Sequence, residues 1–250
     1  MEKKTYLFYS PFHSFIHKVL VTAHECGLWD DIERVPTFPF KNNDGEDVSG
    51  HYSIDALNPL GKVPTLATSD GAILFGSQTI CEYLDSRTTA RRMFPLPGHA
   101  RWDALTRVAL ADSIFEMTVQ MVAEQWNPPE HWRMETFAWL WPKIDRGCDR
   151  LEEQAARGWI EFDVGHAAIL HALSYIGFRS EFYPAKDPLR PHYDWREGRP
   201  VLSAWYDEEI VRPSVRAHYK QVLHDDKSAA YHQRVVAEVL TRRRAQGIAR

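Results

Sequence analysis

The sequence predicts an α/β domain followed by an all-helical domain. Stretches rich in aromatic and β-branched residues, which are typical of strands, lie mostly before residue 86. A polar stretch interrupted by prolines follows at 86–98. Beyond it, apolar residues recur mainly at the spacing of helices. We therefore expect a first domain over residues 1–86 and a second domain over residues 99–250.

The first four elements of the first domain follow from local patterns. Residues 5–9 (TYLFY) are aromatic and β-branched and predict a strand. Residues 14–26 carry apolar side chains at helical spacing, and Gly27 stands where a helix ends. Residues 31–36 predict a second strand. The polar, turn-rich residues 38–53 predict a long loop with a short helix after it.

A hairpin and a helix complete the first domain. The stretches VPTLAT (63–68) and AILF (72–75) flank the turn residues SDG, a hairpin signature. Residues 77–85 predict a helix with Ser77 as its N-cap. The expected order is strand, helix, strand, loop, strand, strand, helix.

The second domain is expected to be built from helices alone. Apolar residues recur at helical spacing in five segments, at approximately 99–126, 130–156, 163–178, 200–211 and 229–246. We expect the last segment to be a C-terminal helical extension of this domain.

The composition is that of an ordinary globular protein and excludes several classes. With 250 residues, 44% of them hydrophobic, the chain can bury a sizeable core. A net charge of −4 argues against binding nucleic acid by neutralising phosphates. No apolar run is long enough to span a bilayer, and the start of the chain lacks the apolar core of a secretory signal. We expect no nucleic-acid or membrane partner.

The cysteines and histidines do not form a metal motif. The three cysteines, Cys26, Cys81 and Cys148, are far apart and form no C-x-x-C pair. This pattern indicates a reducing compartment and argues against a disulfide framework and a structural zinc site. His13 and His17 are four residues apart, but no carboxylate completes a zinc motif. We expect a cytoplasmic protein without a metal.

Three segments resemble those of a known family when read in order. They are NPLGKVPTL (58–66), LFGSQTICEYLD (74–85) and FDVGHAAILHALSYIGFR (162–179). Together with the strand–turn–helix opening, they resemble the cytosolic glutathione transferase superfamily. The opening SPFHSFIHKV is most similar to bacterial members that begin with a serine-proline pair. The stretch at 198–214 is similar to the family's last common helix, so the resemblance covers residues 5–215.

The resemblance implies a fold, a cosubstrate and a reaction. It implies a thioredoxin-like N-terminal domain that holds glutathione and a helical domain that lines a site for a second, apolar substrate. The implied activity is attack of the glutathione thiol on an apolar electrophile, aromatic ones included, as in detoxification. The implied assembly is a homodimer. Two further readings stay open: a glutathione-dependent disulfide reductase or peroxidase, and a non-catalytic binding protein with the same fold.

Four residues are implied to hold the cysteinyl and γ-glutamyl parts of glutathione. Pro64 is expected to follow a cis bond that turns the Val63 backbone toward the tripeptide, which can then pair as a short added strand. Ser77, at a helix start, is expected to meet the γ-glutamyl carboxylate, with Gln78 adding its amide. From the spacing alone, Pro64 is equally an ordinary strand-start proline and Ser77 an ordinary cap.

The sequence offers fewer candidate residues for the glycyl carboxylate and for the amino group of glutathione. Many family members carry an acidic residue at the position of Gly76 to hold the amino group, and glycine cannot do so. Lys62 and His51 are the candidates to pair with the glycyl carboxylate. Plain exposure to solvent is the alternative for both, and for His51 it is the one we favour.

Activation of the thiol needs one hydrogen-bond donor. A free thiol with a pKa near 8.5 is only about 3% ionised at neutral pH. Lowering that pKa to about 6.5 takes about 2.7 kcal/mol. One hydrogen bond to a charged group (roughly 1.5–3 kcal/mol) with a helix N-terminus (roughly 0.3–1 kcal/mol) is enough.

Three residues of the opening stretch can supply this donor. The serine usual in the resembling bacterial members falls at His13 here, and the next residue is Ser14. We rank His13 and Ser14 equally as catalytic candidates. Ser10 comes third, because with Pro11 after it Ser10 also fits a plain helix cap. Ser14 too can be a plain cap, in which case the thiol is poorly activated.

The aromatic residues suggest where a second substrate could bind. The stretch EQWNPPEHWRMETFAWLW (124–141) holds four of the nine tryptophans and borders the second-substrate site in the resembling fold. The candidates are Phe12 and Phe15 near the opening stretch, and Trp126 and Trp132 in this stretch. Core packing is the alternative for such a cluster.

Asp163 is expected to stabilise the start of a buried helix. Family members often place Ser or Thr three residues earlier, where this chain has Ile160, so a full reciprocal cap is not predicted.

Overall fold

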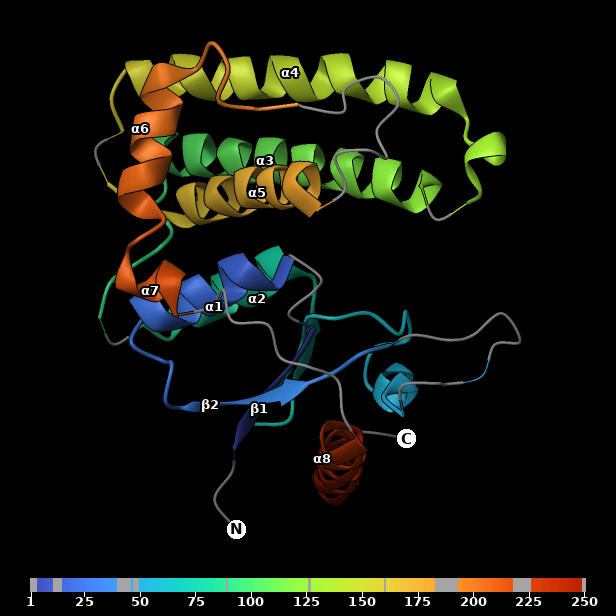
Figure 1. Ribbon diagram of the computed structural model, residues 1–250. Helices are drawn as coiled ribbons and strands as arrows, with labels where there is room; N and C mark the ends of the chain where they lie inside the picture. Colours follow the sequence, from blue (N-terminus) through green and yellow to red (C-terminus); the bar gives the residue numbers. More distant parts are fainter. Residues whose placement is uncertain are drawn as a thin grey trace. The chain divides into compact units, whose positions relative to one another are not determined.

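The computed structural model describes most of the chain, namely residues 4–10, 15–39, 46, 50–88, 90–125, 127–159, 161–182, 193–217 and 226–248 (Figure 1). It divides into two compact units. The first comprises Met1–Met93 together with Ala217–Arg250, and the second comprises Phe94–Arg216.

The first unit is built on a four-stranded sheet. Its strands are β1 (Thr5–Tyr9), β2 (Ile32–Pro36), β3 (Thr65–Ala67) and β4 (Ile73–Phe75). They lie in the order β2-β1-β3-β4. β1 is parallel to β2 and antiparallel to β3, and β3 and β4 form the predicted hairpin. The thioredoxin-like topology implied by the sequence is confirmed.

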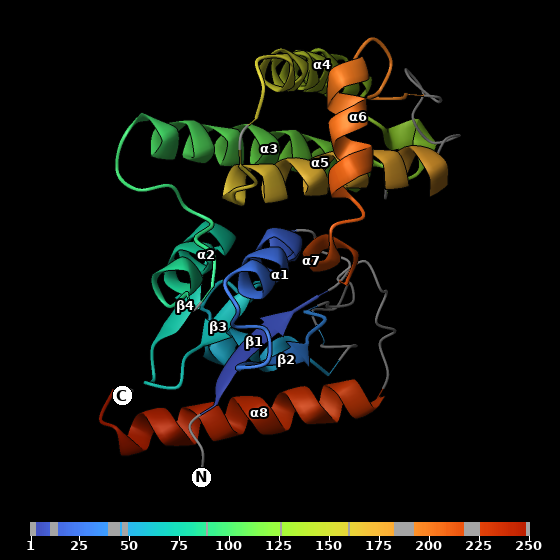
Figure 2. The same cartoon turned by 90° about the vertical axis from the view of Figure 1, so that its left-hand side faces the viewer.

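Helices cover both faces of this sheet. The helices α1 (Phe15–Glu25) and α2 (Ser77–Ser86) pack together on one face, and α8 (Asp226–Ala245) lies on the other (Figure 2). Side chains alternate along a strand, so Tyr6 and Phe8 of β1 point to one face, where they pack with residues of α8. The short 3-10 helix η1 (Tyr52–Ala56) is the one expected after the long loop.

The position of α8 corrects the expected domain boundaries. The sequence assigned residues 217–250 to the helical domain, but in the structure this segment belongs to the first unit. The reason is that the apolar side chains of α8 complete a core cluster on the sheet.

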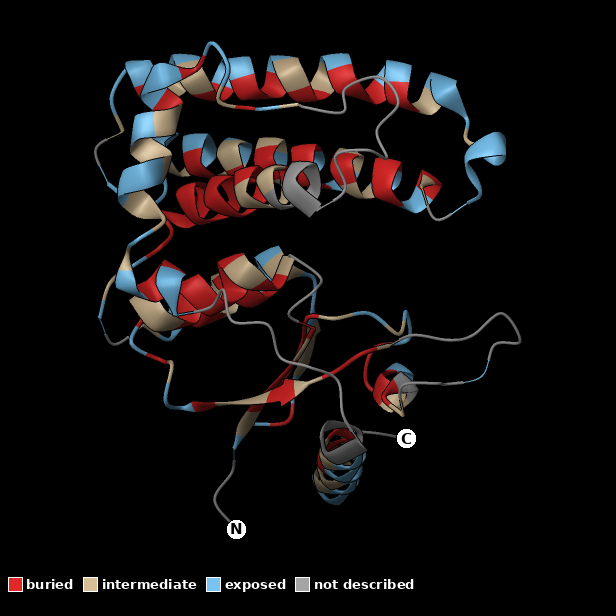
Figure 3. Ribbon diagram, viewed as in Figure 1, coloured by how far each residue is buried: buried red, intermediate tan, exposed pale blue. Residues whose placement is uncertain are grey.

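The second unit is helical, as expected. It holds α3 (His99–Glu124), η2 (Pro129–His131), α4 (Met134–Ala156), α5 (Val164–Phe182), α6 (Pro200–Glu209) and the short α7 (Pro213–Arg216). α3 packs against both α5 and α4, and α4 also packs against α6. Figure 3 shows the buried residues of α4 along the side that faces α3. Among the described helices, none has the length and apolar character needed to cross a membrane.

Candidate functional site

The turn before β3 contains a cis peptide bond. The bond between Val63 and Pro64 is cis, as the sequence predicted. Pro64 is buried, Val63 is half-buried, and the preceding Lys62 is exposed. The Lys62 ammonium group is therefore open to solvent beside the turn.

A buried asparagine organises this turn, and its role was not foreseen from the sequence. The Asn58 Nδ2 atom donates to the Lys62 carbonyl at 2.8 Å and to Thr65 Oγ1 at 3.2 Å. Its Oδ1 atom accepts from the Leu60 amide at 3.1 Å. The Thr65 hydroxyl donates to the same Lys62 carbonyl at 2.8 Å. The signal in the sequence was an asparagine followed by proline, which is typical of a turn that its own side chain closes.

The N-terminus of α2 is open to an anion. Gly76, not Ser77, is the N-cap, and Ser77 is the first helical residue, which corrects the sequence prediction. Gly76 has φ +86° and ψ +117°, a conformation that favours glycine, and it provides no side-chain cap. The first amides of α2 therefore have no capping side-chain acceptor from this residue, and helix N-termini attract negative charge. Ser77 is half-buried, and the exposed Gln78 amide donates to Glu82 at 3.3 Å.

The sheet brings the end of β1, the cis turn and the start of α2 to the same edge. Phe8 of β1 pairs with Thr65, and Thr65 pairs with Phe75 of β4. Continuing these registers by two residues leads to Ser10, Val63 and Ser77. Pairing of the strands thus gathers three predicted site positions that are far apart in the sequence.

Ser10 lies at the end of β1 and is fully buried. Its hydroxyl has no hydrogen-bond partner among the described residues. The other two thiol-activating candidates, His13 and Ser14, lie outside the described residues, between Ser10 and the start of α1.

His51 is not exposed, which makes the favoured sequence interpretation wrong. It is fully buried. Its ring centroid lies 5.3 Å from that of Phe38 and 4.9 Å from that of His232. Contact between His51 and glutathione would require the ring to leave this packing, so Lys62 is the accessible candidate for the glycyl carboxylate.

The second-substrate candidates fall in both units. Phe15 begins α1 and is half-buried, with the buried Lys18 ammonium 5.4 Å from its ring centroid. Trp132 belongs to the second unit, where its Nε1 atom donates to the Asn127 carbonyl at 2.8 Å. Phe12 and Trp126 lie outside the described residues.

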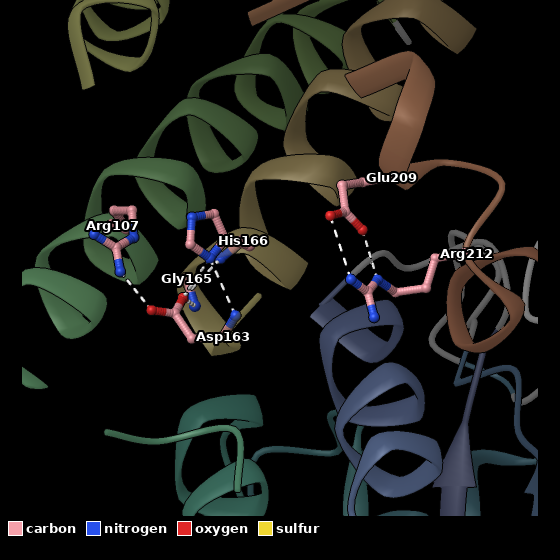
Figure 4. Close-up of polar contacts among 6 residues, drawn as sticks. All are labelled: Arg107, Asp163, Gly165, His166, Glu209 and Arg212. Carbon is pink, nitrogen blue, oxygen red and sulfur yellow. Dashed lines mark hydrogen bonds and ion pairs between the residues drawn. The ribbon is translucent and has the colours of Figure 1, made fainter. Parts of the chain in front are cut away.

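In the second unit, Asp163 and His166 form a reciprocal cap at the start of α5 (Figure 4). The Asp163 carboxylate accepts from the Gly165 amide at 2.9 Å and the His166 amide at 3.1 Å. The Asp163 amide donates to His166 Nδ1 at 3.0 Å. This corrects the expectation that no reciprocal cap forms. Asp163 is itself the N-cap, and a histidine takes the place of the usual Glu or Gln.

Arg107 of α3 completes this arrangement. Its guanidinium forms an ion pair with the Asp163 carboxylate, and both side chains are largely buried. Gly165 permits the close approach of α5 to α3, because a Cβ atom there would lie 2.8 Å from the Ala104 carbonyl and 2.7 Å from the Arg107 Cβ. Burial alone would raise the pKa of Asp163, but the hydrogen bond with His166 and the nearby charges of His166 and Arg107 lower it overall.

The connection from α6 to α7 contacts the residues just before α5. Arg212 and Glu209 form an ion pair, drawn in Figure 4, and the Arg212 guanidinium lies 4.1 Å from the ring centroid of Phe162. These contacts support the helical unit and provide no reactive group. Among the described residues, no cluster of His, Cys, Asp or Glu side chains is arranged to hold a metal ion.

A family model matches the part of the chain that builds this edge of the sheet. Residues 12–87 match the N-terminal domain of glutathione S-transferase. A curated relative is the uncharacterized GST-like protein YibF of Escherichia coli (strain K12). It is 29% identical over 181 residues, which are 71% of this chain and 84% of YibF.

Solved structures share the fold of most of the chain. A glutathione transferase family member from Pseudomonas fluorescens Pf-5, solved with bound glutathione, is 29% identical. The match has a TM-score of 0.70 and covers 88% of this chain and 100% of that one. A glutathione S-transferase from Methylobacillus flagellatus KT, also with glutathione bound, is 26% identical, with a TM-score of 0.74 and coverage of 88% and 100%. Together with the cis turn, the open α2 N-terminus and the helical second unit, these matches show that the chain is similar to glutathione transferases in the sequence of residues 12–87 and in the fold of most of its length.

Proposed function

We propose that this protein is a glutathione transferase that ionises the thiol of bound glutathione for attack on an apolar electrophile, aromatic ones included. The observation that carries the proposal is the gathering of the β1 end, the cis Val63–Pro64 turn and the open α2 N-terminus at one edge of the sheet. Relatives with glutathione bound, at 26–29% identity, support the choice of cosubstrate.

Each part of glutathione has a proposed partner at this edge. The γ-glutamyl carboxylate meets the first amides of α2, with the Ser77 hydroxyl and the Gln78 amide beside them. The cysteinyl unit pairs with the Val63 backbone as an added strand. The exposed Lys62 ammonium pairs with the glycyl carboxylate. Gly76 has no side chain for the amino group, so we expect weaker glutathione binding than in relatives with an acid there.

The thiol is activated by His13 or Ser14. Either can donate one hydrogen bond to the thiolate, next to the start of α1. Ser10 stays third, because its hydroxyl is fully buried. The proposal needs no metal and no second base, since one charged hydrogen bond and a helix N-terminus account for the required shift in the thiol pKa.

The test is the ultraviolet thiolate absorbance of bound glutathione against pH. It is measured for the native chain, His13→Ala, Ser14→Ala and Ser10→Ala. We expect a bound-thiol pKa about 2 below that of free glutathione, lost in either the His13 or the Ser14 variant. Binding with an unshifted pKa would instead indicate a ligand-binding protein. Analysis of products then separates conjugation from glutathione-dependent disulfide or peroxide reduction.

The assembly proposed from the family is a homodimer. Sedimentation equilibrium of the native chain tests it, and a monomer at all concentrations would contradict it.

A further inference from the structure

α8 packs against the segment that leads to the cis turn. Three valines of α8, Val235, Val236 and Val239, are buried in one core cluster. On the sheet and the segment 54–63, that cluster includes Tyr6, Phe8, Val35, Ile54, Leu57 and Ala67, with Val63 packed against it. The helix therefore contacts η1 and shares this core cluster with Val63 of the cis turn.

His232 of α8 joins two points that are distant in the sequence. Its Nδ1 atom lies 3.0 Å from Thr37 Oγ1, just after β2, and its Nε2 atom lies 3.2 Å from Ser53 Oγ in η1. The imidazole is fully buried. Thr37 and Ser53 are the two ends of the long connection between β2 and η1, so a single ring holds these ends together.

One neutral tautomer of His232 matches the hydrogen bonds around it. The Thr37 hydroxyl donates its one proton to the Val35 carbonyl at 3.0 Å, so it accepts from His232 Nδ1–H. The Nε2 atom of the neutral ring is then an acceptor for the Ser53 hydroxyl. Both contacts are therefore satisfied at once by a neutral imidazole.

Ring packing reinforces this junction. The His232 ring centroid lies 4.9 Å from that of His51 and 5.6 Å from that of Phe8. The exposed Gln233 adds a hydrogen bond to the Gly50 carbonyl at 2.9 Å. The contacts with His51 and Gly50 reach residues immediately before η1, and the contact with Phe8 reaches β1.

Other contacts hold α8 to the sheet without touching this segment. The Tyr6 hydroxyl donates to Glu238 at 2.9 Å, and the Tyr231 hydroxyl bonds Glu33 of β2. The Arg242 guanidinium donates to the Lys4 carbonyl at 3.0 Å. The contacts of α8 with the sheet and its contacts with η1 can thus be changed by separate substitutions.

We infer that α8 holds the glutathione-binding segment in its binding conformation, with His232 as the positioning residue. The inference rests on the proposed function, because it takes Lys62 and Val63 as ligands of glutathione. His232 does not touch glutathione. It acts through Ser53 and η1, by reducing the loss of conformational freedom that binding would otherwise require. The helix α8 thereby supports the glutathione site without contacting the ligand.

Two isosteric substitutions in the full-length chain test this role. His232→Asn keeps a donor at the position of Nδ1 and loses the bond to Ser53. His232→Gln keeps a polar group at the position of Nε2 and loses the bond to Thr37. Both lose the ring, so their difference compares the contact with Ser53 of η1 with the contact with Thr37. Tyr6→Phe is the control, because it weakens the attachment of α8 to β1 alone.

The measurements are the Kd of glutathione by calorimetry, the thermal midpoint, and amide hydrogen exchange over residues 50–57. We expect His232→Asn to raise the Kd about 3- to 10-fold and to speed exchange at 54–57. We expect His232→Gln to keep both the Kd and the exchange at 54–57 close to their native values. Tyr6→Phe should lower the thermal midpoint and leave the Kd unchanged.

Several outcomes would overturn the inference. Equal Kd and equal exchange for the Asn and Gln variants would give Ser53 no role. A Kd that rises in Tyr6→Phe in step with its thermal midpoint would make the effect one of general stability. If the native chain binds no glutathione, the proposed function fails. Hydrogen exchange then decides alone whether His232 holds η1, and identical exchange in native and Asn variants refutes it.

Discussion

At the scale of single residues, Asn58 shapes the candidate site without being one of its predicted ligands. Its buried carboxamide makes hydrogen bonds to Lys62, Thr65 and Leu60 around the turn before Pro64. The family resemblance singled out Val63 and Pro64, and the charge of Lys62 made it the candidate for the glycyl carboxylate. A residue that acts by closing a turn has no such chemical signature.

Replacing Asn58 tests this role. We expect Asn58→Ala to lower the free energy of unfolding by roughly 2 kcal/mol, because it removes three hydrogen bonds and leaves buried partners unsatisfied. We also expect a higher Kd for glutathione. Denaturant unfolding and calorimetry measure the two effects. Asn58→Asp is the matched control, since it keeps the acceptor for the Leu60 amide and loses both donated bonds. A change below about 0.5 kcal/mol in Asn58→Ala would contradict the role.

The backbone conformation of Gly76 favours glycine, and its lack of a side chain leaves the glutathione amino group without a carboxylate there. Its φ of +86° is strained for any residue with a side chain, but a Cβ there has room, with Thr79 Oγ1 the nearest atom at 3.6 Å. We expect Gly76→Ala and Gly76→Glu each to reduce stability by roughly 1–3 kcal/mol through backbone strain. Only the Glu variant should lower the Kd for glutathione, because it supplies a carboxylate for the amino group. Unfolding curves and calorimetry on both variants separate strain from charge. A Kd that falls equally in both would contradict the charge argument.

At the scale of elements, the start of α5 depends on the Asp163–His166 cap. The His166 Nδ1 atom lies 3.0 Å from both the Asp163 amide and the Asp163 carboxylate. A neutral ring accepts from the amide, and a protonated ring donates to the carboxylate, so a bond survives in either state. The sequence predicted the helix but no reciprocal cap, because Ile160 stands where family members often place Ser or Thr, and the partner is instead His166, three residues after Asp163.

The pH dependence of stability follows from the same carboxylate. The pKa of Asp163 is lower in the folded protein than in the unfolded chain. The stabilisation by its charged form is therefore present above about pH 4 and lost as pH falls through the folded-state pKa. We expect Asp163→Ala to cost roughly 3 kcal/mol at neutral pH, because it leaves Arg107 buried without its carboxylate. Unfolding followed by tryptophan fluorescence measures the cost.

A conservative variant serves as the control for this pH effect. Asp163→Asn keeps an acceptor for the helix amides and removes only the charge. The difference in stability between native and Asp163→Asn proteins should shrink below pH 4. A difference that stays constant down to pH 3 would show that the charge is unimportant.

At the scale of the whole molecule, the chain forms two units, and the first of them is built from two separate segments of the sequence. Cys26 and Cys81 lie in the first unit and Cys148 in the second, and all three are buried thiols. Burial raises the pKa of Cys26 and of Cys148 to about 11. Each thiol can therefore report on the opening of its own unit.

We expect a thiol reagent at neutral pH to modify none of the three cysteines in the native protein and all three in denaturant, since the buried thiols are not accessible to the reagent. Variants that keep only Cys26 or only Cys148 should show whether the two units open at the same denaturant concentration. Rapid stoichiometric modification of the native chain would contradict the burial of these residues.

The sequence by itself determined most elements of this protein and the order of an α/β unit and a helical unit, and the resemblance to a known family added the cis proline turn. These follow from local patterns: side-chain periodicity, turn residues and short motifs whose spacing survives divergence. Only the tertiary structure decided that Gly76 caps α2, that His51 is buried against His232, and that α8 belongs to the first unit. The burial of His51 and the position of α8 depend on contact between residues far apart in the chain, whereas the cap depends on the backbone conformation of Gly76. Apolar periodicity shows that a helix has a buried face, but it does not show which surface covers that face.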